Sequence, residues 1–257
     1  MKSRETEAAL VIRSNNAAQI ANQIANIETL GTFRLEPQQT QKIRDIYFDT
    51  PDQLLQKQKL ALRIRRVNGK TLITLKGPAQ KKAGGGQERL EIELAWSFTA
   101  LTRIVRELRA RKIEIKLTRQ DFVRTDPVGT LKRLGFVLIQ DRTTIRQVRK
   151  ITVADQSNEE ELAELAVDAV TYRLGKQAVR LHEVEIEAKH KNARLEEMIQ
   201  PLEKMFKPAL LAWQSKLATG RALQTLLEDG QLDKYLDDRN NLKPTAYTKL
   251  GRLVSQV

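Results

Sequence analysis

The sequence predicts an α+β fold: a closed antiparallel β-barrel with a charged interior, covered on the outside by α-helices. Two observations carry this prediction. Several strand-like stretches alternate charged with aliphatic residues, and apolar residues in the segments between them follow helical spacing. The aliphatic strand faces need cover, which amphipathic helices supply. A charged interior is costly unless its charges pair or bind ions, so it indicates a function rather than a folding device.

The stretch 182–189 shows the alternation most clearly. Glu183, Glu185 and Glu187 share one face of a strand, and aliphatic side chains share the other. An ordinary half-buried strand whose acids face water would give the same pattern. However, acids also alternate at 5–7 and at 89–94. Like charges on one face repel unless cations or opposite charges neutralise them, so the repeated pattern indicates a site for metal ions and polyanions.

Composition narrows the class of function. The 257 residues carry a formal charge of +13 and a pI near 10.0, which predicts polyanionic partners such as nucleic acid, nucleotides or polyphosphate. The absence of cysteine excludes disulfides, thiolate metal sites and a cysteine nucleophile, and it fits a cytoplasmic location. No apolar run approaches ~18 residues, and the first residues lack the apolar core of a signal peptide. We therefore expect no membrane association.

The first elements are a strand, a helix and a second strand. We expect a strand over 4–13, followed by a helix N-cap signal at 14–16. Apolar residues then recur at helical spacing to Leu30, and Gly31 closes the helix. A second strand over 42–49 ends in a turn.

A hairpin about Asn68-Gly69 is the most informative local prediction. A two-residue loop there pairs a strand at 60–67 with one at 70–76. In that register Arg63 lies opposite Thr74. The back of the hairpin is aliphatic. Its front face carries three cations: Arg63, Arg65 and Lys76.

The second half of the chain alternates helices and strands. The basic, glycine-rich stretch 81–86 lacks the Lys-Ser/Thr of a phosphate-binding P-loop and is predicted to be a connector. The further expected elements are a strand at 89–94, helices at 97–111 and 128–134, strands at 136–139 and 142–153, a hairpin of 165–174 with 177–188, helices at 195–206 and 209–227, and a polar tail. A two-residue loop at Gly175-Lys176 would pair Asp168 with Glu183 and extend the acidic face.

Seven short motifs, in order, resemble the CYTH domain, or triphosphate tunnel metalloenzyme family. They are Glu5-Thr6-Glu7, Tyr47-Phe48-Asp49-Thr50-Pro51, Leu62-Arg63-Ile64-Arg65, Thr74-Leu75-Lys76-Gly77, Arg89 to Glu93, Glu183 to Glu187, and Ser215-Lys216. The resemblance implies an eight-stranded antiparallel tunnel that binds triphosphate and a divalent metal, Mg²⁺ or Mn²⁺. It also implies one CYTH domain over 1–227, followed by a C-terminal tail at 228–257.

The resemblance implies roles for individual residues. The metal-site acids would be Glu5, Glu7, Asp168, Glu183, Glu185 and Glu187. The phosphate-binding cations would be Arg63, Arg65, Lys76, Arg89 and Lys216, with a further arginine at Arg142 or Arg146. Catalysis would rest on Glu5, Glu7, Glu185, Glu187 and Lys76, and Glu91 and Glu93 would be further tunnel acids. Carboxylate oxygens suit hard divalent cations, and arginine forks suit phosphate.

The chain departs from the family pattern at two places. The family opens with Glu-x-Glu-x-Lys, and this chain has Ala9 where the lysine belongs. The segment 215–220 lacks a basic residue often found before its glycine.

The predicted function is metal-dependent hydrolysis of a small triphosphate, with inorganic tripolyphosphate ahead of nucleoside or thiamine triphosphate. One alternative is a non-catalytic module that binds polyphosphate or RNA, favoured by the net charge and the missing lysine. Aromatic residues, which stack on single-stranded bases, make up only 5% of the chain and are absent from the charged strands, so nucleic acid is not the favoured partner. A second alternative is an activity like that of class IV adenylate cyclases.

Overall fold

The computed structural model describes residues 3–81, 87–153, 160–190 and 193–255. Most of the basic, glycine-rich connector expected at 81–86 lies outside these residues. The chain divides into two compact units, which are described separately below. Unit 1 contains 43–79 and 89–142 together with the first residues of the chain, and unit 2 contains 5–42, 80–88 and 143–257.

The strands follow one continuous hydrogen-bonded order. They are β1 (Ser3–Ile12), β2 (Thr29–Leu30), β3 (Phe33–Pro37), β4 (Gln41–Asp49), β5 (Ala61–Val67), β6 (Lys70–Lys81), β7 (Gln87–Ala95), β8 (Val137–Val153), β9 (Ala163–Leu174), β10 (Gln177–Ala188) and β11 (Leu210–Ala212). Neighbours run β2-β3-β8-β4-β5-β6-β7-β1-β10-β9, β11 pairs with β1, and β8 also pairs with β9. The path from β8 to β9 thus closes through eight strands, which confirms the predicted closed barrel.

Among the described residues, the helices include the five that the sequence predicts and two, at 54–57 and 246–254, that it does not. They are α1 (Ala17–Ala25), α2 (Leu54–Lys57), α3 (Phe98–Arg109), α4 (Pro127–Arg133), α5 (Leu195–Met205), α6 (Lys216–Glu228) and α7 (Ala246–Val254), with a 3₁₀ helix η1 (Leu232–Tyr235). Within the described residues, no helix is both long and apolar enough to span a membrane.

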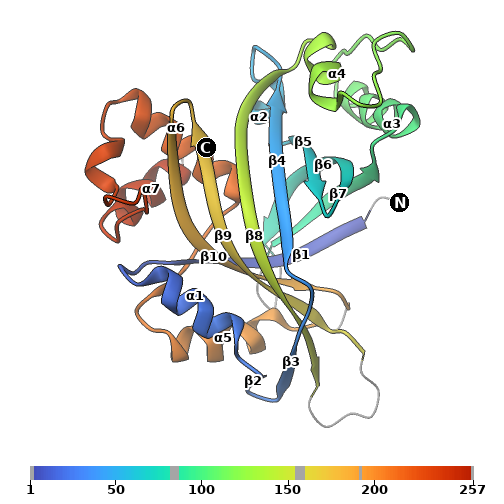
Figure 1. The fold of residues 1–257 in the computed structure, drawn as a ribbon. Helices are drawn as coiled ribbons and strands as arrows, with labels where there is room; N and C mark the ends of the chain where they lie inside the picture. The colour runs from blue at the N-terminus through green and yellow to red at the C-terminus, as the bar shows by residue number, and fades with distance from the viewer. Residues whose placement is uncertain (1–2, 82–86, 154–159, 191–192, 256–257) are drawn as a thin grey trace. The chain divides into compact units, whose positions relative to one another are not determined.

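Unit 1 is built on the antiparallel run β4-β5-β6. The β5–β6 register pairs Arg63 with Thr74, as predicted, because the two-residue turn fixes the alignment. The apolar backs of these strands form one hydrophobic cluster with α3 and α4, in which Ile64 and Ile104 are at most 1% exposed. The two helices lie beside each other in Figure 1. Ser97 begins α3 by accepting a hydrogen bond from the Ala100 backbone N–H.

Unit 2 is built on the long β9–β10 hairpin. The loop at Gly175-Lys176 aligns it so that Asp168 lies opposite Glu183, as predicted. The helices α1 and α5 pack on one part of this hairpin, as Figure 1 shows. The helices α6 and α7 pack together and share a hydrophobic cluster with other residues of β9 and β10.

Three segments differ from the predicted elements. The helix expected at 209–227 begins only at Lys216, because the preceding residues form β11 against β1 and Ser215 caps the helix. The first helix ends at Ala25 rather than at Leu30, since residues 29–30 pair with β3. The two strands expected at 136–139 and 142–153 form the single strand β8. In the tail, Leu232 and Tyr247 are buried in the cluster that contains α6.

Candidate functional site

A cluster of cations, here called the cation cluster, lies on the charged face of unit 1. It contains Arg63, Arg65, Lys76 and Arg142. Arg63 and Arg65 alternate on β5, so both point to the face opposite the apolar backing of the strand. The side chains of Arg63, Arg65 and Arg142 are between 2% and 17% exposed, so these guanidinium groups are largely withdrawn from water.

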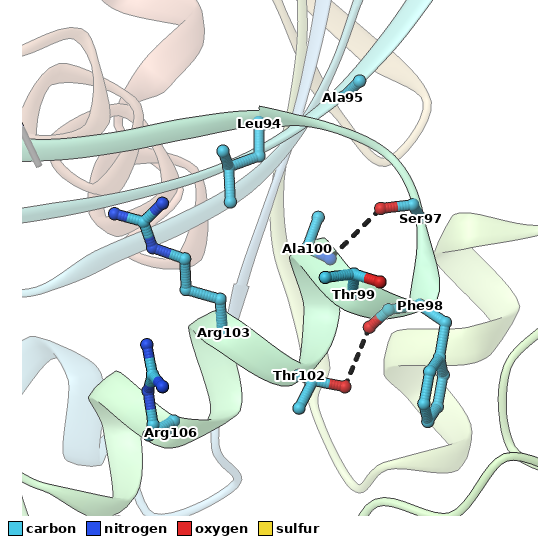
Figure 2. A pocket seen from close by; sticks show the side chains of 9 residues that line it. All are labelled: Leu94, Ala95, Ser97, Phe98, Thr99, Ala100, Thr102, Arg103 and Arg106. Atoms are coloured by element: carbon cyan, nitrogen blue, oxygen red, sulfur yellow. Dashed lines mark hydrogen bonds between the residues drawn. The ribbon is translucent and has the colours of Figure 1, made fainter. Parts of the chain in front are cut away.

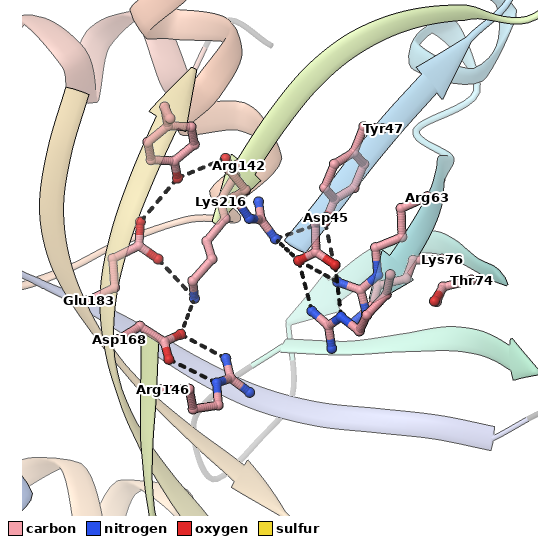
Figure 3. A network of polar contacts seen from close by, with 12 residues as sticks. Asp45, Tyr47, Arg63, Thr74, Lys76, Arg142, Arg146, Asp168, Glu183 and Lys216 are labelled. Atoms are coloured by element: carbon pink, nitrogen blue, oxygen red, sulfur yellow. Dashed lines mark hydrogen bonds and ion pairs between the residues drawn. The ribbon is translucent and has the colours of Figure 1, made fainter. Parts of the chain in front are cut away.

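Asp45 on β4 is the anion that these guanidinium groups share, as Figure 3 shows. Arg65 donates two hydrogen bonds to its carboxylate, from Nε at 2.8 Å and from Nη2 at 3.0 Å. Arg142 Nη2 lies 2.8 Å from Oδ2, and Arg63 Nη1 lies 3.7 Å from the same oxygen. Burial by itself would raise the pKa of Asp45, but the three arginines outweigh it and hold the pKa well below its usual value.

Tyr47 lies beside the same arginines. Its hydroxyl accepts hydrogen bonds from Arg142 Nη2 at 3.0 Å and from Arg63 Nη1 at 3.3 Å. The Arg142 guanidinium also lies 5.0 Å from the centre of the Tyr47 ring, a cation–π contact. Burial opposes ionisation of the phenol, yet Arg142 and Arg63 favour the phenolate and bring the pKa of Tyr47 below its usual value.

The predicted tunnel acids Glu91 and Glu93 also face the cation cluster. Glu91 lies 3.5 Å from Arg63 and 3.3 Å from Lys76. Glu93 lies 3.3 Å from Arg63 and accepts a hydrogen bond from the Thr74 hydroxyl at 2.8 Å. Arg89 lies on the same strand, two residues before Glu91. In the described part of the chain, the four cations of the cluster thus contact the carboxylates of Asp45, Glu91 and Glu93, which balance much of their charge.

A second cluster, here called the acid cluster, forms within unit 2. Asp168 and Glu183 are both 0% exposed, and Lys216 Nζ lies 3.0 Å from an oxygen of each. Lys216 also contacts Glu185. Arg146 binds Asp168 through two hydrogen bonds, at 2.8 and 2.7 Å, and reaches Glu185 at 2.5 Å.

Ion pairing within the acid cluster shifts the pKa values of Lys216 and Asp168 in opposite directions. Burial opposes a charge on Lys216, but Glu183, Glu185 and Asp168 outweigh it and raise the pKa of the ammonium group. Asp168 is also desolvated, and Arg146 and Lys216 nevertheless bring its pKa below the usual value. These shifts favour the charged forms of both Lys216 and Asp168, so the two groups form an ion pair inside the cluster.

The predicted acids Glu5 and Glu7 lie on β1, which pairs with the C-terminal half of β10. The β1–β10 register pairs Glu7 with Glu187 and Ala9 with Glu185. Glu187 contacts Lys189 at 3.0 Å. Burial raises the pKa of Glu187, and repulsion from Glu5 adds to this effect while Lys189 opposes it. The ionised form of Glu187 is therefore disfavoured relative to that of an exposed glutamate.

The carboxylate oxygens on β1, β9 and β10 are the kind of ligand that a hard divalent cation prefers. The described side chains are nevertheless not arranged as a metal-binding group. Among the described residues, no group of three or more aspartate, glutamate, histidine or cysteine side chains is placed to hold a metal ion. Asp168 and Glu185 are bound to Arg146 and Lys216 instead. Burial is the largest cause of the raised pKa of Glu187, and repulsion from Glu5 adds to it, so a cation bound beside these two acids would favour the ionised form of Glu187.

The structure assigns the two arginines that the sequence could not separate to different clusters. Arg142 binds Asp45 in the cation cluster, whereas Arg146 binds Asp168 in the acid cluster. Asp45 and Tyr47 were not among the predicted site residues, although Tyr47 opens one of the seven motifs. The signal was present, because both lie on the same face of β4 and the β4–β5 register places them opposite Arg65 and Arg63. An acid alternating with a tyrosine in a strand next to an arginine-rich strand predicts such pairing.

A pocket of about 680 Å³ lies elsewhere in unit 1, between the end of β7 and α3. Figure 2 shows Arg103 and Arg106 extending from α3 on the same side as Leu94. The pocket contains none of the residues predicted for the site.

The chain is similar to several solved structures, of which one has a TM-score above 0.5 and shares this fold. One solved structure, a putative adenylyl cyclase from Hippeastrum described as having a dominant triphosphatase activity, is 20% identical with a TM-score of 0.52, over 85% of this chain and 95% of that chain. A putative adenylate cyclase from Bacillus halodurans is 22% identical with a TM-score of 0.47, over 83% of this chain and 96% of that chain. The Mimivirus capping enzyme triphosphatase is 12% identical with a TM-score of 0.32, over 79% of this chain and 86% of that chain.

None of the curated proteins compared with the chain matches it. The model of the CYTH domain, by contrast, matches residues 11–219, most of the sequence. That range includes both hairpins, β5–β6 and β9–β10, on which the two clusters are built. The chain belongs to the CYTH domain family.

Proposed function

We propose that this protein is a divalent-metal-dependent hydrolase of a small triphosphate, with inorganic tripolyphosphate as the first candidate and nucleoside or thiamine triphosphate next. The observation that carries the proposal is the cation cluster. Three guanidinium groups converge on a desolvated face together with Lys76. Arginine forks match phosphate oxygens in geometry and in charge, and low exposure strengthens these contacts.

Arg63, Arg65, Lys76 and Arg142 would bind the phosphate oxygens. The Arg63 Nε–H is buried and has no hydrogen-bond partner among the residues that the structure describes, so it is a donor for a bound anion. Because the carboxylates of Asp45, Glu91 and Glu93 already offset much of the positive charge of the cluster, the cluster by itself does not balance a triphosphate. This imbalance supports the need for a further cation. Arg89 on β7 would also contact the substrate.

The acids on β1 and β10 are the proposed ligands of that cation, Mg²⁺ or Mn²⁺. Glu5, Glu7 and Glu187 would hold it, with support from Glu183 and Glu185 on β10 and from Asp168 on the paired strand β9. When bound, the metal would neutralise charge on the phosphoryl oxygens and lower the pKa of a water. Lys216 keeps the buried acids in place and is a second candidate for a phosphate contact. Positioning and charge neutralisation would supply most of the rate.

The test is a phosphate-release assay on the full chain with tripolyphosphate, ATP and thiamine triphosphate. Each substrate is assayed with Mg²⁺, with Mn²⁺ and with a chelator. We expect metal-dependent release that is fastest with tripolyphosphate, and we expect Glu7→Gln to abolish it. The exposed Glu114 provides a matched control, because Glu114→Gln removes the same charge far from β1 on the chain. Turnover that survives the chelator, or no turnover on any substrate, contradicts the proposal.

The same assay separates the two alternatives. An adenylate cyclase would convert ATP to cyclic AMP and pyrophosphate. A binding module would retain tripolyphosphate or RNA with a strong dependence on salt, and would release no phosphate. ATP or thiamine triphosphate replaces tripolyphosphate as the favoured substrate only if its kcat/KM is higher than that of tripolyphosphate with the same metal ion.

A further inference from the structure

The carboxylate of Asp45 occupies a distinct place in the cation cluster. It contacts three of the four cations, and it does so from β4, whereas the cations come from β5 and β8. Its side chain is 1% exposed, compared with 34% for Glu93 and 15% for Glu91. Asp45 is therefore the innermost anion of the cluster, and both of its oxygens receive arginine hydrogen bonds.

The geometry around Asp45 constrains where each guanidinium can lie. Arg65 binds it as a fork, which fixes the plane of that guanidinium. Arg142 bridges the Asp45 carboxylate and the Tyr47 hydroxyl, so two partners fix its position. Arg63 donates to Tyr47 from one terminal nitrogen and to Glu93 from the other. Without the central anion, three buried like charges would repel one another and separate toward water.

We propose that Asp45 is a positioning residue of the phosphate site, holding Arg63, Arg65 and Arg142 in their binding arrangement before substrate arrives. The expected effect of Asp45 on turnover rests on the proposed function, whereas its effect on the arrangement of the three arginines does not. A positioning role and a role in charge cancellation alone predict opposite effects of removing Asp45 on polyanion binding. If Asp45 only cancelled positive charge, its removal would strengthen the binding of a polyanion, whereas the loss of a positioning residue weakens binding and slows turnover.

Three variants test the proposal on the full chain. Asp45→Asn keeps the shape but loses the charge, and Asp45→Glu keeps the charge but moves it by one methylene group. Asp141→Asn is the matched control, because Asp141 on β8 accepts a similar two-bond fork from Arg44 on β4, and Arg44 is not a member of the cation cluster. Tripolyphosphate affinity is measured by calorimetry in chelator, and kcat and KM are measured with metal.

We expect both Asp45 variants to bind tripolyphosphate about tenfold or more weakly and to lose about tenfold to a hundredfold in kcat/KM. We expect Asp141→Asn to stay within about twofold of the parent protein, since an ion pair at that exposure contributes little. Tighter binding by a folded Asp45→Asn protein overturns the proposal. If Asp45→Asn does not fold, Asp45→Glu decides alone, and unchanged affinity and kcat/KM in that variant overturn the proposal as well.

Tyr47 provides a readout that does not depend on activity. Arg142, Arg63 and Arg65 favour its ionised form, whereas burial and Asp45 oppose it. Ultraviolet titration, with Tyr47→Phe subtracted to remove the other tyrosines, reports its pKa. If the arginines stay in place when Asp45 becomes asparagine, the pKa of Tyr47 falls further, which contradicts the proposal. If they separate, as we expect, the pKa rises toward its ordinary value.

The titration also separates the two possible failures. If the parent protein hydrolyses no triphosphate, the proposed function is wrong, but the Tyr47 titration and the calorimetric affinities still decide the role of Asp45. If the protein is a triphosphatase and Asp45→Glu retains full kcat/KM, the proposed function stands and the positioning role fails.

Discussion

Asp168 and Glu183 lie directly opposite each other across the β9–β10 pairing, and both carboxylates are fully buried. Two like charges at facing positions of a sheet destabilise it unless a cation lies between them. Lys216 Nζ lies 3.0 Å from both, at the start of α6, which Ser215 caps. The capped helix therefore places its first residue where the sheet requires a positive charge.

The first prediction concerns that lysine. Lys216→Met leaves two buried carboxylates without their shared cation and should lower the free energy of unfolding by roughly 3–5 kcal/mol at pH 7. Urea denaturation measures the change. Lys189→Met is the control, because Lys189 also contacts acids of this hairpin but its side chain is 31% exposed, so a loss of about 1 kcal/mol or less is expected. Equal losses in the two variants would show that burial does not set the strength of these contacts.

The second prediction separates Arg142 from Arg146. Arg142→Met removes a phosphate-binding candidate and should weaken tripolyphosphate binding in chelator by about tenfold, the effect of one charge-assisted hydrogen bond. Arg146→Met removes a cation that binds Asp168 and Glu185, so it should change metal-dependent stabilisation more than metal-free binding. Calorimetry with tripolyphosphate alone, followed by thermal unfolding with and without Mg²⁺, tests both. If the two variants behave in the opposite way, the roles assigned to the two clusters must be exchanged.

The third prediction is an acid-induced loss of stability. The pKa values of Asp45 and Asp168 are lowered in the folded protein, so each contributes stability that is present above the unfolded pKa of about 3.9 and is lost as the pH falls through the folded pKa. The contribution of Glu187 to stability depends on pH in the opposite direction, because its pKa is raised in the folded protein. That contribution is present at low pH and is lost as the pH rises through the folded pKa. Urea denaturation at intervals from pH 7 to pH 3 should show a steep fall below about pH 4. A stability that rises below pH 4 would contradict this.

Much of the fold followed from local patterns in the sequence. Asn68-Gly69 and Gly175-Lys176 each demand a two-residue turn, and a tight turn sets the register of both strands for their full length. The pairings of Arg63 with Thr74 and of Asp168 with Glu183 were predicted for this reason. Helix lengths were less predictable. The segment at 210–212 has helical composition but forms β11, since β1 offers it backbone partners that no local pattern reveals.

The composition of the clusters was predicted only in part. Alternating charge identified the faces that carry Arg63, Glu91 and Glu183, because a strand side chain has only two directions. It could not reveal which charges meet. Asp45 lies in a strand that mixes charged with aliphatic and aromatic residues, and its role depends on the pairing of β4 with β5. The separation of Arg142 from Arg146 likewise depends on which strand each residue faces, which spacing alone does not give.

The last prediction concerns Ala9, where this chain lacks the lysine of the family pattern. The structure pairs Ala9 with Glu185 across β1 and β10, two residues beyond Glu7. A lysine there would point along the same strand face as the proposed metal ligands, with an acid directly opposite to reduce its cost. We expect Ala9→Lys to strengthen tripolyphosphate binding or raise turnover about ten- to a hundredfold, the effect of one charge-assisted hydrogen bond worth ~1.5–3 kcal/mol.

Two controls make the Ala9 comparison interpretable. Ala9→Met adds similar length without charge and should leave tripolyphosphate affinity unchanged. Ala8→Lys places the same charge on the opposite face, where Ala8 packs against the apolar cluster that includes α1, and should lower stability instead. Urea denaturation first establishes that each variant is folded, since a buried unpaired lysine would cost stability. If Ala9→Lys folds normally and changes neither affinity nor turnover, the phosphate does not reach residue 9, and the substrate contacts assigned to this strand face must be reassigned.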